Sequence, residues 1–493
     1  MLTSLWFLKN NIQNMSKNFY ITTTLPYVNS DPHVGFATEF VRADIIARSK
    51  KLQGFDVFFN TGTDEHGQKL WTVAKEQGRD VKEYVDEYAE KFKGLQKLLG
   101  ISEDVHFIRT TDEHHQKAAQ EFWMRCDKAG YIYKKNYQIK YCVGCELEKT
   151  DSELVDGKCE LHPKLDIELR DEENYFFKAS ALQYKLLKYY KNNPTFVVPD
   201  FRFNEIKSFV ERGLEDFSIS RLKEKMSWGV SVPGDENHVM YVWFDALVNY
   251  ISTLGWPEDT ETFEKFWANG TPVQYCGKDN LRQQSAMWQS MLMAAGLPNT
   301  NKIVINGFLT GDGGVKMSKS LGNVINPYDV VNEYGADAFR FFVSKEISNF
   351  EDSPFTMERF KESYNSGLAN GIGNLVSRVM KMAEANLESP VEVTDSENME
   401  TYFSFLNNFE INKTSEYIWK NIGEMDLFIQ ENQPFKVVKT DKDSGIKMIQ
   451  ELVVRLYSVA RMLSPIMPET SKKIIELIKT NKSPETPLFL RKD

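Results

Sequence analysis

Long apolar runs are missing from this chain of 493 residues, and none approaches the roughly eighteen residues that a membrane-spanning helix needs. Residues 1–20, MLTSLWFLKNNIQNMSKNFY, lack the basic region and the small-residue cleavage site of a secretion signal. Cysteine is scarce, at five residues, so the cores must form without a disulfide framework. These absences predict a cytoplasmic globular protein without a membrane partner, long enough for about two to four domains.

Positive charge is in the minority, because 60 lysines and arginines face 70 aspartates and glutamates and leave a formal net charge of −10. Affinity for phosphate backbones comes from basic surface. The balance therefore argues against a non-specific nucleic-acid binder, but it leaves room for a local basic groove.

Short β-rich runs alternate with longer helical patterns from Phe19 onward, as in FYITTTL, HVGFATEFVRADIIARSKKLQG and FDVFFNTG. This alternation predicts an α/β fold with a doubly wound, Rossmann-type parallel sheet. The pattern stops near Asp127, where tyrosine-rich segments carry three of the five cysteines, and it resumes after Lys225. From Pro327 onward, helical periodicity predicts an all-α bundle.

The sheet domain is therefore expected to be split by an inserted domain and followed by helices. Met15 directly precedes the first strand, so the residues before it are interpreted as an extension from an alternative start. The predicted parts are the extension (1–14), the first half of the catalytic domain (15–126), the insert (127–225), the second half (226–326), a connecting stem (327–365) and the helical domain (366–493).

The segment TLPYVNSDPHVGF, residues 24–36, offers a first anion site. A strand ends at Pro26, and the sequence from Pro32 opens a helix whose N-terminal N–H groups can face an anion. Gly35 lets a ligand approach the backbone, and His33 adds a side-chain donor. Taken alone, the segment is more typical of a plain strand-to-helix turn with a surface histidine.

A second anion site is indicated by GDGGVKMSKSLGN, where Lys316 and Lys319 follow a glycine-rich turn without a neighbouring acidic residue. Two lysines three residues apart can face a polyphosphate together, and they neutralise the charge that grows on its leaving oxygens. The alternative is a solvated basic turn.

The Pro-His-x-Gly turn after the first strand, together with KMSKS after the last, resembles the two signature sequences of the class I aminoacyl-tRNA synthetases. Further segments are similar, in the same order, to the methionyl-tRNA synthetase family, and the resemblance covers the chain from about Met15 to its end. These segments are TLPYVNSDPHVG, NTGTDEHGQK, FVERGLEDFSISR, YVWFDALVNYIS, GKD and VKMSKSLGNVI.

This resemblance implies an ATP site. His33 and Gly35 would bind ATP, Lys319 would hold the departing pyrophosphate with Lys316 assisting, and Lys278 would contact the nucleotide. Mg²⁺ would accompany ATP and help to neutralise its charge.

The resemblance also implies an L-methionine site, in which Asp64 would hold the ammonium group while Arg221 and Asp279 organise the site. Sulfur packs well against aromatic edges, which suits a thioether pocket, although core packing is the alternative for the aromatic members. The residues expected to line this pocket are Leu25, Tyr27, Trp243, Tyr250, Gln284 and Trp288.

Two segments depart from the family pattern, at three positions. Phe36 stands where the family usually has a second histidine that contacts the ribose. After GKD, Asn280 replaces an aliphatic residue and Gln284 replaces a histidine that reaches the methionine pocket. A glutamine retains hydrogen-bonding capacity at that position.

A structural zinc site is predicted in the insert by the spacing Cys142-x2-Cys145-x13-Cys159-x2-His162. Each two-residue spacing presents two ligands to one tetrahedral ion, and a closed, sulfur-rich set suits structural zinc. The alternative is three reduced core cysteines beside an exposed histidine. The remaining thiols, Cys126 and Cys276, are expected to be buried.

Polar side chains recur every fourth residue at Asn370, Asn374 and Arg378, within roughly 80° of one helix face. The family reads its anticodon with this pattern and a Pro-Trp pair, which here becomes Pro434 and Phe435. An ordinary solvated helix face is the alternative.

The resemblance implies that the chain activates methionine with ATP to methionyl-adenylate and pyrophosphate, and then transfers the methionyl group to the 3′ end of tRNA(Met) with a CAU anticodon. Alternatives are another class I synthetase and a non-catalytic paralogue that binds tRNA. The family's dimeric members rely on an appended domain, so a monomer is expected.

Overall fold

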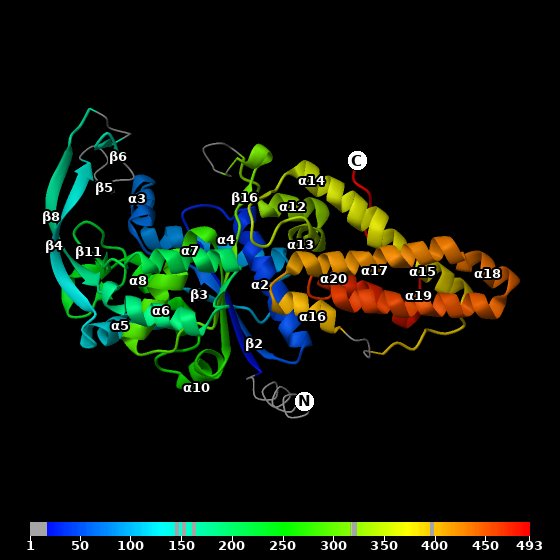
Figure 1. Cartoon of the computed structure of the whole chain (residues 1–493). Helices are drawn as coiled ribbons and strands as arrows, with labels where there is room; N and C mark the ends of the chain where they lie inside the picture. Colours follow the sequence, from blue (N-terminus) through cyan, green and yellow to red (C-terminus); the bar gives the residue numbers. More distant parts are fainter. Residues whose placement is uncertain are drawn as a thin grey trace, which may run out of the picture.

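The computed structural model describes residues 17–142, 147–149, 154–159, 164–315, 317, 323–394 and 399–493. A sheet domain occupies the centre of the molecule, an arched β-hairpin forms one end, and a helical bundle forms the other (Figure 1). Among the described residues, no helix combines the length and the apolar character needed to cross a membrane.

Six strands of the described chain form one parallel sheet in the order β3-β2-β1-β14-β15-β9. The first half of the chain supplies one side of this sheet, and β14 pairs with β1 to begin the other side. The predicted split parallel sheet is thus confirmed. Its strands are β1 (Asn18–Thr23), β2 (Asp56–Thr63), β3 (His106–Arg109), β9 (Val197–Val198), β14 (Thr271–Gly277) and β15 (Lys302–Asn306).

Strand β9 lies inside the range predicted for the insert, yet it joins the main sheet, where Ile303 pairs with Val197. Two residues are too short a run to give a strand signal by alternation. The chain therefore returns to the sheet once between the two halves, through α6 (Gln183–Asn192) and α7 (Asp200–Glu211).

Helix α2 (Val34–Leu52) follows β1 and is buried on most of its surface. It lies on β1, β2 and β14, and its outer side is covered by α13 (Ala336–Lys345) and α16 (Glu400–Asn407). A helix that is covered from two sides needs apolar or small residues nearly all round, which explains its VGFATEFVRADIIA sequence. This packing fixes the N-terminus of α2 at the edge of the sheet.

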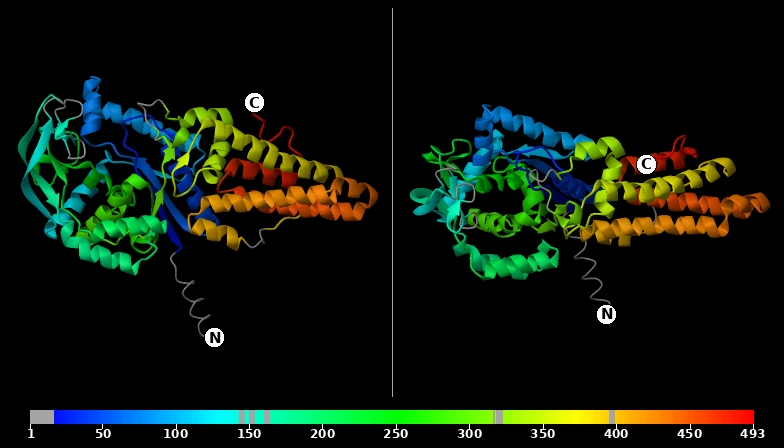
Figure 2. Two further views of the ribbon diagram at one scale, coloured as in Figure 1. Left: turned by 45° about the horizontal axis from the view of Figure 1, so that its top comes forward. Right: turned by 90° about the horizontal axis from the view of Figure 1, so that it is seen from above.

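The insert is dominated by the antiparallel pair β4 (Ile132–Cys142) and β8 (Ile167–Phe177), which remain in register over their full length. Beyond the sheet domain lie α15 (Asn374–Asn386), α17 (Ile411–Asn432), α18 (Pro434–Thr440), α19 (Lys442–Leu463) and α20 (Pro468–Thr480), so the predicted helical region is confirmed. Figure 2 shows this bundle extending away from the sheet in both views. One continuous apolar cluster nevertheless runs from Phe19 of the sheet to Ile478 of the bundle.

Candidate active site

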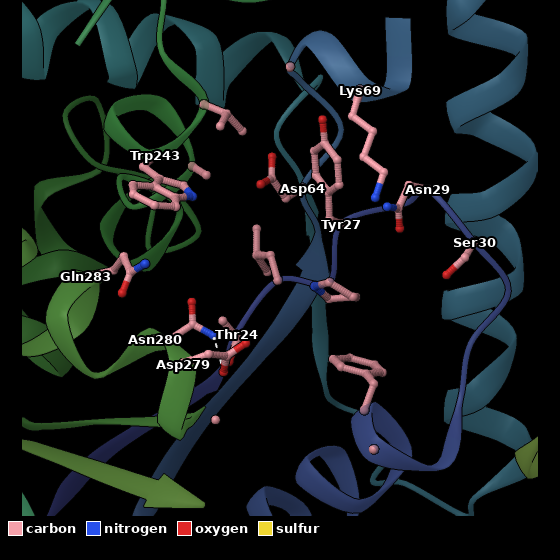
Figure 3. A pocket seen from close by; sticks show the side chains of 18 of the residues that line it. Thr24, Tyr27, Asn29, Ser30, Asp64, Lys69, Trp243, Asp279, Asn280 and Gln283 are labelled. Carbon is pink, nitrogen blue, oxygen red and sulfur yellow. Dashed lines mark hydrogen bonds between the residues drawn. The ribbon is translucent and has the colours of Figure 1, made fainter. Parts of the chain in front are cut away.

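A cavity of about 1350 Å³ opens at the carboxyl ends of the parallel strands, where the strand order reverses between β1 and β14. Such a reversal leaves a crevice in which α/β proteins bind ligands. Figure 3 shows side chains from both halves of the sheet facing this space. The predicted residues that line it are Leu25, Tyr27, His33, Gly35, Asp64, Arg221, Trp243, Tyr250, Asp279 and Gln284.

Two predicted residues lie beside this lining. The Lys278 Nζ atom forms an ion pair with Asp352 at 2.6 Å. The Trp288 ring is fully buried behind Tyr250, with 5.9 Å between their ring centroids. Trp288 therefore supports the wall of the cavity from behind. The loop lysines Lys316 and Lys319 lie outside the described residues.

The His33 turn is held in the geometry of a helix N-cap. The His33 side chain accepts a hydrogen bond from the Gly35 N–H group through Nδ1 at 3.1 Å. A Cβ atom at Gly35 would lie 2.8 Å from this imidazole, so glycine is needed for the close approach. The Val34 N–H group donates to the Ile325 carbonyl at 3.1 Å, which brings the segment after the lysine loop against the turn.

Phe36 makes the surface beside the His33 turn apolar. Its ring packs edge-on against Phe92, with centroids 5.5 Å apart, and also lies against Phe40. Phe36 therefore belongs to an aromatic cluster on α2 and α4 (Val81–Leu98), and it supplies no polar atom to the cavity.

Asp64 lies between Tyr27 and Trp243 (Figure 3). Its backbone is fixed on both sides, since its N–H group donates to the Pro26 carbonyl at 3.0 Å and its carbonyl accepts from Val28 at 3.2 Å. Among the described residues, its buried Oδ1 atom has no hydrogen-bond partner. Burial, with Asp245 and Glu65 nearby, raises the pKa of Asp64 well above its usual value. A cation in the cavity would pair with this carboxylate and stabilise its ionised form.

A buried carboxylate, Asp245, holds the wall that carries Trp243. It lies in α8 (Val242–Ala246), and its two oxygens contact His66 Nδ1 at 2.9 Å and His115 Nε2 at 3.3 Å. Burial raises the pKa of Asp245, but the two histidines outweigh it and leave the pKa below its usual value. Sequence reasoning missed this triad, although His66 and Asp245 lie inside the GTDEHGQK and YVWFDA segments.

Glu39 is a second missed residue beneath the cavity. Its Oε1 atom accepts hydrogen bonds from the Thr24 N–H group at 2.8 Å and from the Thr24 hydroxyl at 2.7 Å. Burial raises the pKa of Glu39 to about 7, and the charge of Asp279 adds to the shift. Glu39 thereby ties the end of β1 to α2.

Arg221 and Asp279, predicted to act together, both line the cavity, but within the described part of the chain no ion pair joins them. Arg221 donates to the Ser220 carbonyl at 2.7 Å, and its guanidinium lies 4.3 Å from the centroid of the Tyr241 ring. Both charges line the same cavity, so a ligand of mixed charge can contact both.

The zinc prediction is only partly covered by the structure. Cys142 and Cys159 are 1% and 2% exposed. Neither belongs to the apolar clusters formed by the described residues, so a hydrophobic core does not account for their burial. Cys145 and His162 lie outside the described residues, and among those described no three ligating side chains gather around one point. Two buried thiols that lie outside the apolar clusters of the described residues suit a sulfur-rich metal site.

The bundle residues are arranged differently from a regular helix face. Asn370 lies in the π-helical segment Tyr364–Gly373, and Gly371 interrupts the helix before α15 begins at Asn374. The spacing argument assumed one regular α-helix through the three residues, whereas the structure has a π-helical segment before α15, which spacing in the sequence does not register. Arg378 pairs with Asp426 at 2.7 Å. Pro434 is buried, and Phe435 is 43% exposed in α18, at the far end of the bundle (Figure 1).

Comparison with known proteins gives a consistent result. The family model described as tRNA synthetases class I (M) matches residues 19–164 and 145–380. The chain is 41% identical over 479 residues to the methionine–tRNA ligase of Caldanaerobacter subterraneus subsp. tengcongensis, across 94% of this chain and 74% of that protein. It is 39% identical over 483 residues to the Thermotoga maritima methionine–tRNA ligase, across 94% and 76%.

Solved structures agree. The Mycobacterium tuberculosis methionyl-tRNA synthetase in complex with methionyl-adenylate is 34% identical and superposes with a TM-score of 0.86, over 96% of this chain and 99% of that one. The apo form of the enzyme from the same organism is 30% identical, with a TM-score of 0.80 over 97% and 99%.

Proposed function

This chain belongs to the methionine–tRNA ligase family of class I tRNA synthetases, and on that premise we propose how its residues carry out the reaction. It is an aminoacyl-tRNA ligase that activates methionine with ATP and transfers the methionyl group to tRNA. The observation that carries the assignment of roles is the buried, unpartnered Oδ1 atom of Asp64 at the cavity wall, within the described chain. This atom provides a place for an ammonium group.

Methionine binds with its ammonium group on Asp64 and its side chain toward Tyr250 and Gln284. Its carboxylate oxygen attacks the α-phosphorus of ATP, a P–O bond forms, and the bond to the departing pyrophosphate breaks. The N-terminus of α2 and His33 bind the phosphates, because the positive end of the helix dipole and a nearby side-chain donor favour negative charge. Mg²⁺ bound to ATP supplies further charge neutralisation.

The loop lysines Lys316 and Lys319 complete the proposal by holding the pyrophosphate, while Lys278 approaches the nucleotide. The ribose hydroxyl at the 3′ end of tRNA(Met) then attacks the carbonyl carbon of methionyl-adenylate, and AMP leaves. Arg221 and Asp279 contact opposite charges of the substrates across the cavity.

Several finer roles belong to the same proposal. Asn370, Asn374, Arg378, Pro434 and Phe435 read the CAU anticodon, which the exposed Phe435 ring supports. Cys142, Cys145, Cys159 and His162 hold one structural zinc ion. The chain acts in the cytoplasm as a monomer, with a site built from its own residues.

Methionine-dependent exchange of pyrophosphate into ATP tests this proposal. We expect exchange with methionine and its loss in Lys319→Ala, while Lys188→Ala, at an exposed lysine of α6, keeps it. Exchange with leucine or cysteine in place of methionine would overturn the substrate. A chain that binds tRNA but supports no exchange with any amino acid would be a non-catalytic paralogue.

A further inference from the structure

A hydrogen-bond network of buried side-chain amides and hydroxyls extends from the loop before β15 to the methionine end of the cavity. Its members are Gln274 in β14, Gln284 in the π-helical segment Gln283–Met287, Gln289 in α11 (Trp288–Ala295), Thr300 and Tyr250. All five are at most 2% exposed. Water therefore does not compete for their hydrogen bonds, and each donor must face an acceptor.

Two backbone groups fix the orientation of the first amide in this network, that of Gln289. The Thr300 N–H group only donates, and it donates to Gln289 Oε1 at 3.1 Å. The Gln284 carbonyl only accepts, and it accepts from Gln289 Nε2 at 2.9 Å. Amide orientations are often ambiguous, but here both partners have a fixed role. The Gln289 side chain therefore has one orientation.

The orientation of Gln289 determines which atom donates and which accepts in each later hydrogen bond. Gln289 Nε2 also donates to the Thr300 hydroxyl at 3.0 Å, so that hydroxyl directs its own hydrogen to Gln274 Oε1 at 2.6 Å. The Gln274 carbonyl is thus occupied, and its Nε2 atom donates to Gln284 Oε1 at 2.9 Å. The Gln284 Nε2 atom then faces the Tyr250 hydroxyl and donates to it at 2.5 Å.

The last group in this hydrogen-bond network is the Tyr250 hydroxyl, whose hydrogen atom lies at the cavity. Tyr250 lines the cavity and accepts from Gln284, so its own hydroxyl hydrogen is not used in that bond. In the part of the chain that the structure describes, no hydrogen bond uses that hydrogen. Burial raises the pKa of the Tyr250 hydroxyl well above its usual value, so the hydrogen is retained.

We propose that Gln274 and Thr300 are positioning residues for substrate specificity: through Gln284 they turn the Tyr250 hydroxyl into a hydrogen-bond donor toward the substrate side chain. This inference rests on the proposed function. A thioether sulfur accepts a hydrogen bond but cannot donate one. A wall that presents a donor therefore favours methionine over norleucine, in which a methylene replaces the sulfur. Gln284 orients the Tyr250 hydroxyl through an amide, which does not titrate, where the family usually has a histidine.

The test compares kcat/KM for methionine and norleucine in pyrophosphate exchange. Thr300→Val removes the hydroxyl that fixes Gln274 while keeping its shape, and Thr300→Ser restores that hydroxyl. We expect Thr300→Val to lower the methionine-to-norleucine ratio by roughly fivefold, the size of one hydrogen bond, mainly through the KM for methionine. In Thr300→Ser the ratio should return toward that of the native chain.

Gln274→Met is the second variant, and it should lower the ratio in the same direction because Gln284 then lacks its donor. A structural effect alone would weaken both substrates equally. An unchanged ratio in Thr300→Val and Gln274→Met, or an equal loss for both substrates, would overturn the proposal. If the unaltered chain shows no exchange with methionine at all, the proposed function fails instead, and the two failures are thereby distinguished.

Discussion

Among single residues, Asp64 combines burial, a neighbouring carboxylate and an unpartnered oxygen within the described chain. Only its ionised form attracts an ammonium group, so methionine should bind better as the pH rises through the raised pKa of Asp64. In Asp64→Asn we expect the KM for methionine to rise by roughly 100-fold, since an unpaired buried charge costs about 2–5 kcal/mol. Exchange kinetics between pH 5 and 8 would measure both effects.

The control for Asp64 is Asp31→Asn, at an exposed carboxylate that pairs with Lys91 and follows Ser30 of the cavity lining in the sequence. It should change the KM for methionine by about twofold at most, because exposed pairs contribute little. A native pH profile in Asp64→Asn, or an equal rise in both variants, would contradict the assignment.

The family resemblance placed residues from distant parts of the sequence in the cavity, and the fold explains some of them. Asp64 and Asp279 lie just after β2 and β14, and the carboxyl ends of parallel strands share one edge. His115 was not predicted, because it lies 130 residues from its partner Asp245 and no local pattern links them. Long-range pairs between buried polar groups need the fold before they can be recognised.

At the scale of elements, the tip of the bundle offers Phe435 as a stacking surface in α18, 43% exposed. Stacking of a base on an aromatic ring is worth about 1–3 kcal/mol. We therefore expect Phe435→Ala to raise the KM for tRNA by roughly tenfold or more, without affecting pyrophosphate exchange. Leu427→Ala, at a 51% exposed leucine of α17, is the matched control. Equal effects of both changes on tRNA charging would exclude a specific role for the ring.

The insert allows a second test at this scale. We expect about one zinc ion per chain, bound by the four predicted ligands. Cys142→Ser should abolish zinc binding, whereas Cys126→Ser should retain it, because Cys126 lies in an apolar cluster with Phe122. Metal analysis of the purified variants measures the difference. A folded native chain without metal would contradict the prediction.

The sequence predicted where helices and strands occur, but it did not predict the π-helical irregularities within the helices. The parallel sheet and the bundle follow from hydrophobic periodicity, which the structure confirms. The π-helical segments Gln283–Met287 and Tyr364–Gly373 were missed. A π-helical turn adds one residue, so the apolar period on each side of it stays that of an α-helix and the sequence gives no sign of the added residue. Both segments carry residues of the proposed sites.

For the whole molecule, one buried ion pair links the sheet domain, helix α13 and the helical bundle. Asp44 of α2 contacts Arg340 of α13 at 2.7 Å, and both side chains are fully buried. Arg340 also donates to the carbonyls of Pro465 and Ile466, at the corner between α19 and α20. Asp44→Asn leaves this guanidinium without its counter-charge, and we expect it to lower the free energy of unfolding by about 3–5 kcal/mol. Urea denaturation at pH 7 measures the loss.

The pH dependence of this loss separates the ion pair from mere packing. Burial raises the pKa of Asp44, but Arg340 and Arg48 outweigh it and leave the pKa below its usual value. The stabilisation is therefore complete above about pH 4, the pKa of an unfolded aspartate, and disappears as the pH falls through the lowered pKa. The difference between the native chain and Asp44→Asn should shrink accordingly.

The matched control is Asp104→Asn, whose carboxylate is 62% exposed and pairs with Lys51 at the surface. It should cost at most about 1 kcal/mol. Because the apolar cluster is continuous from the sheet to the bundle, both parts should unfold in one transition in the native chain. Two separate transitions in the native chain, or equal losses in Asp44→Asn and Asp104→Asn, would show that the pair does not join these parts.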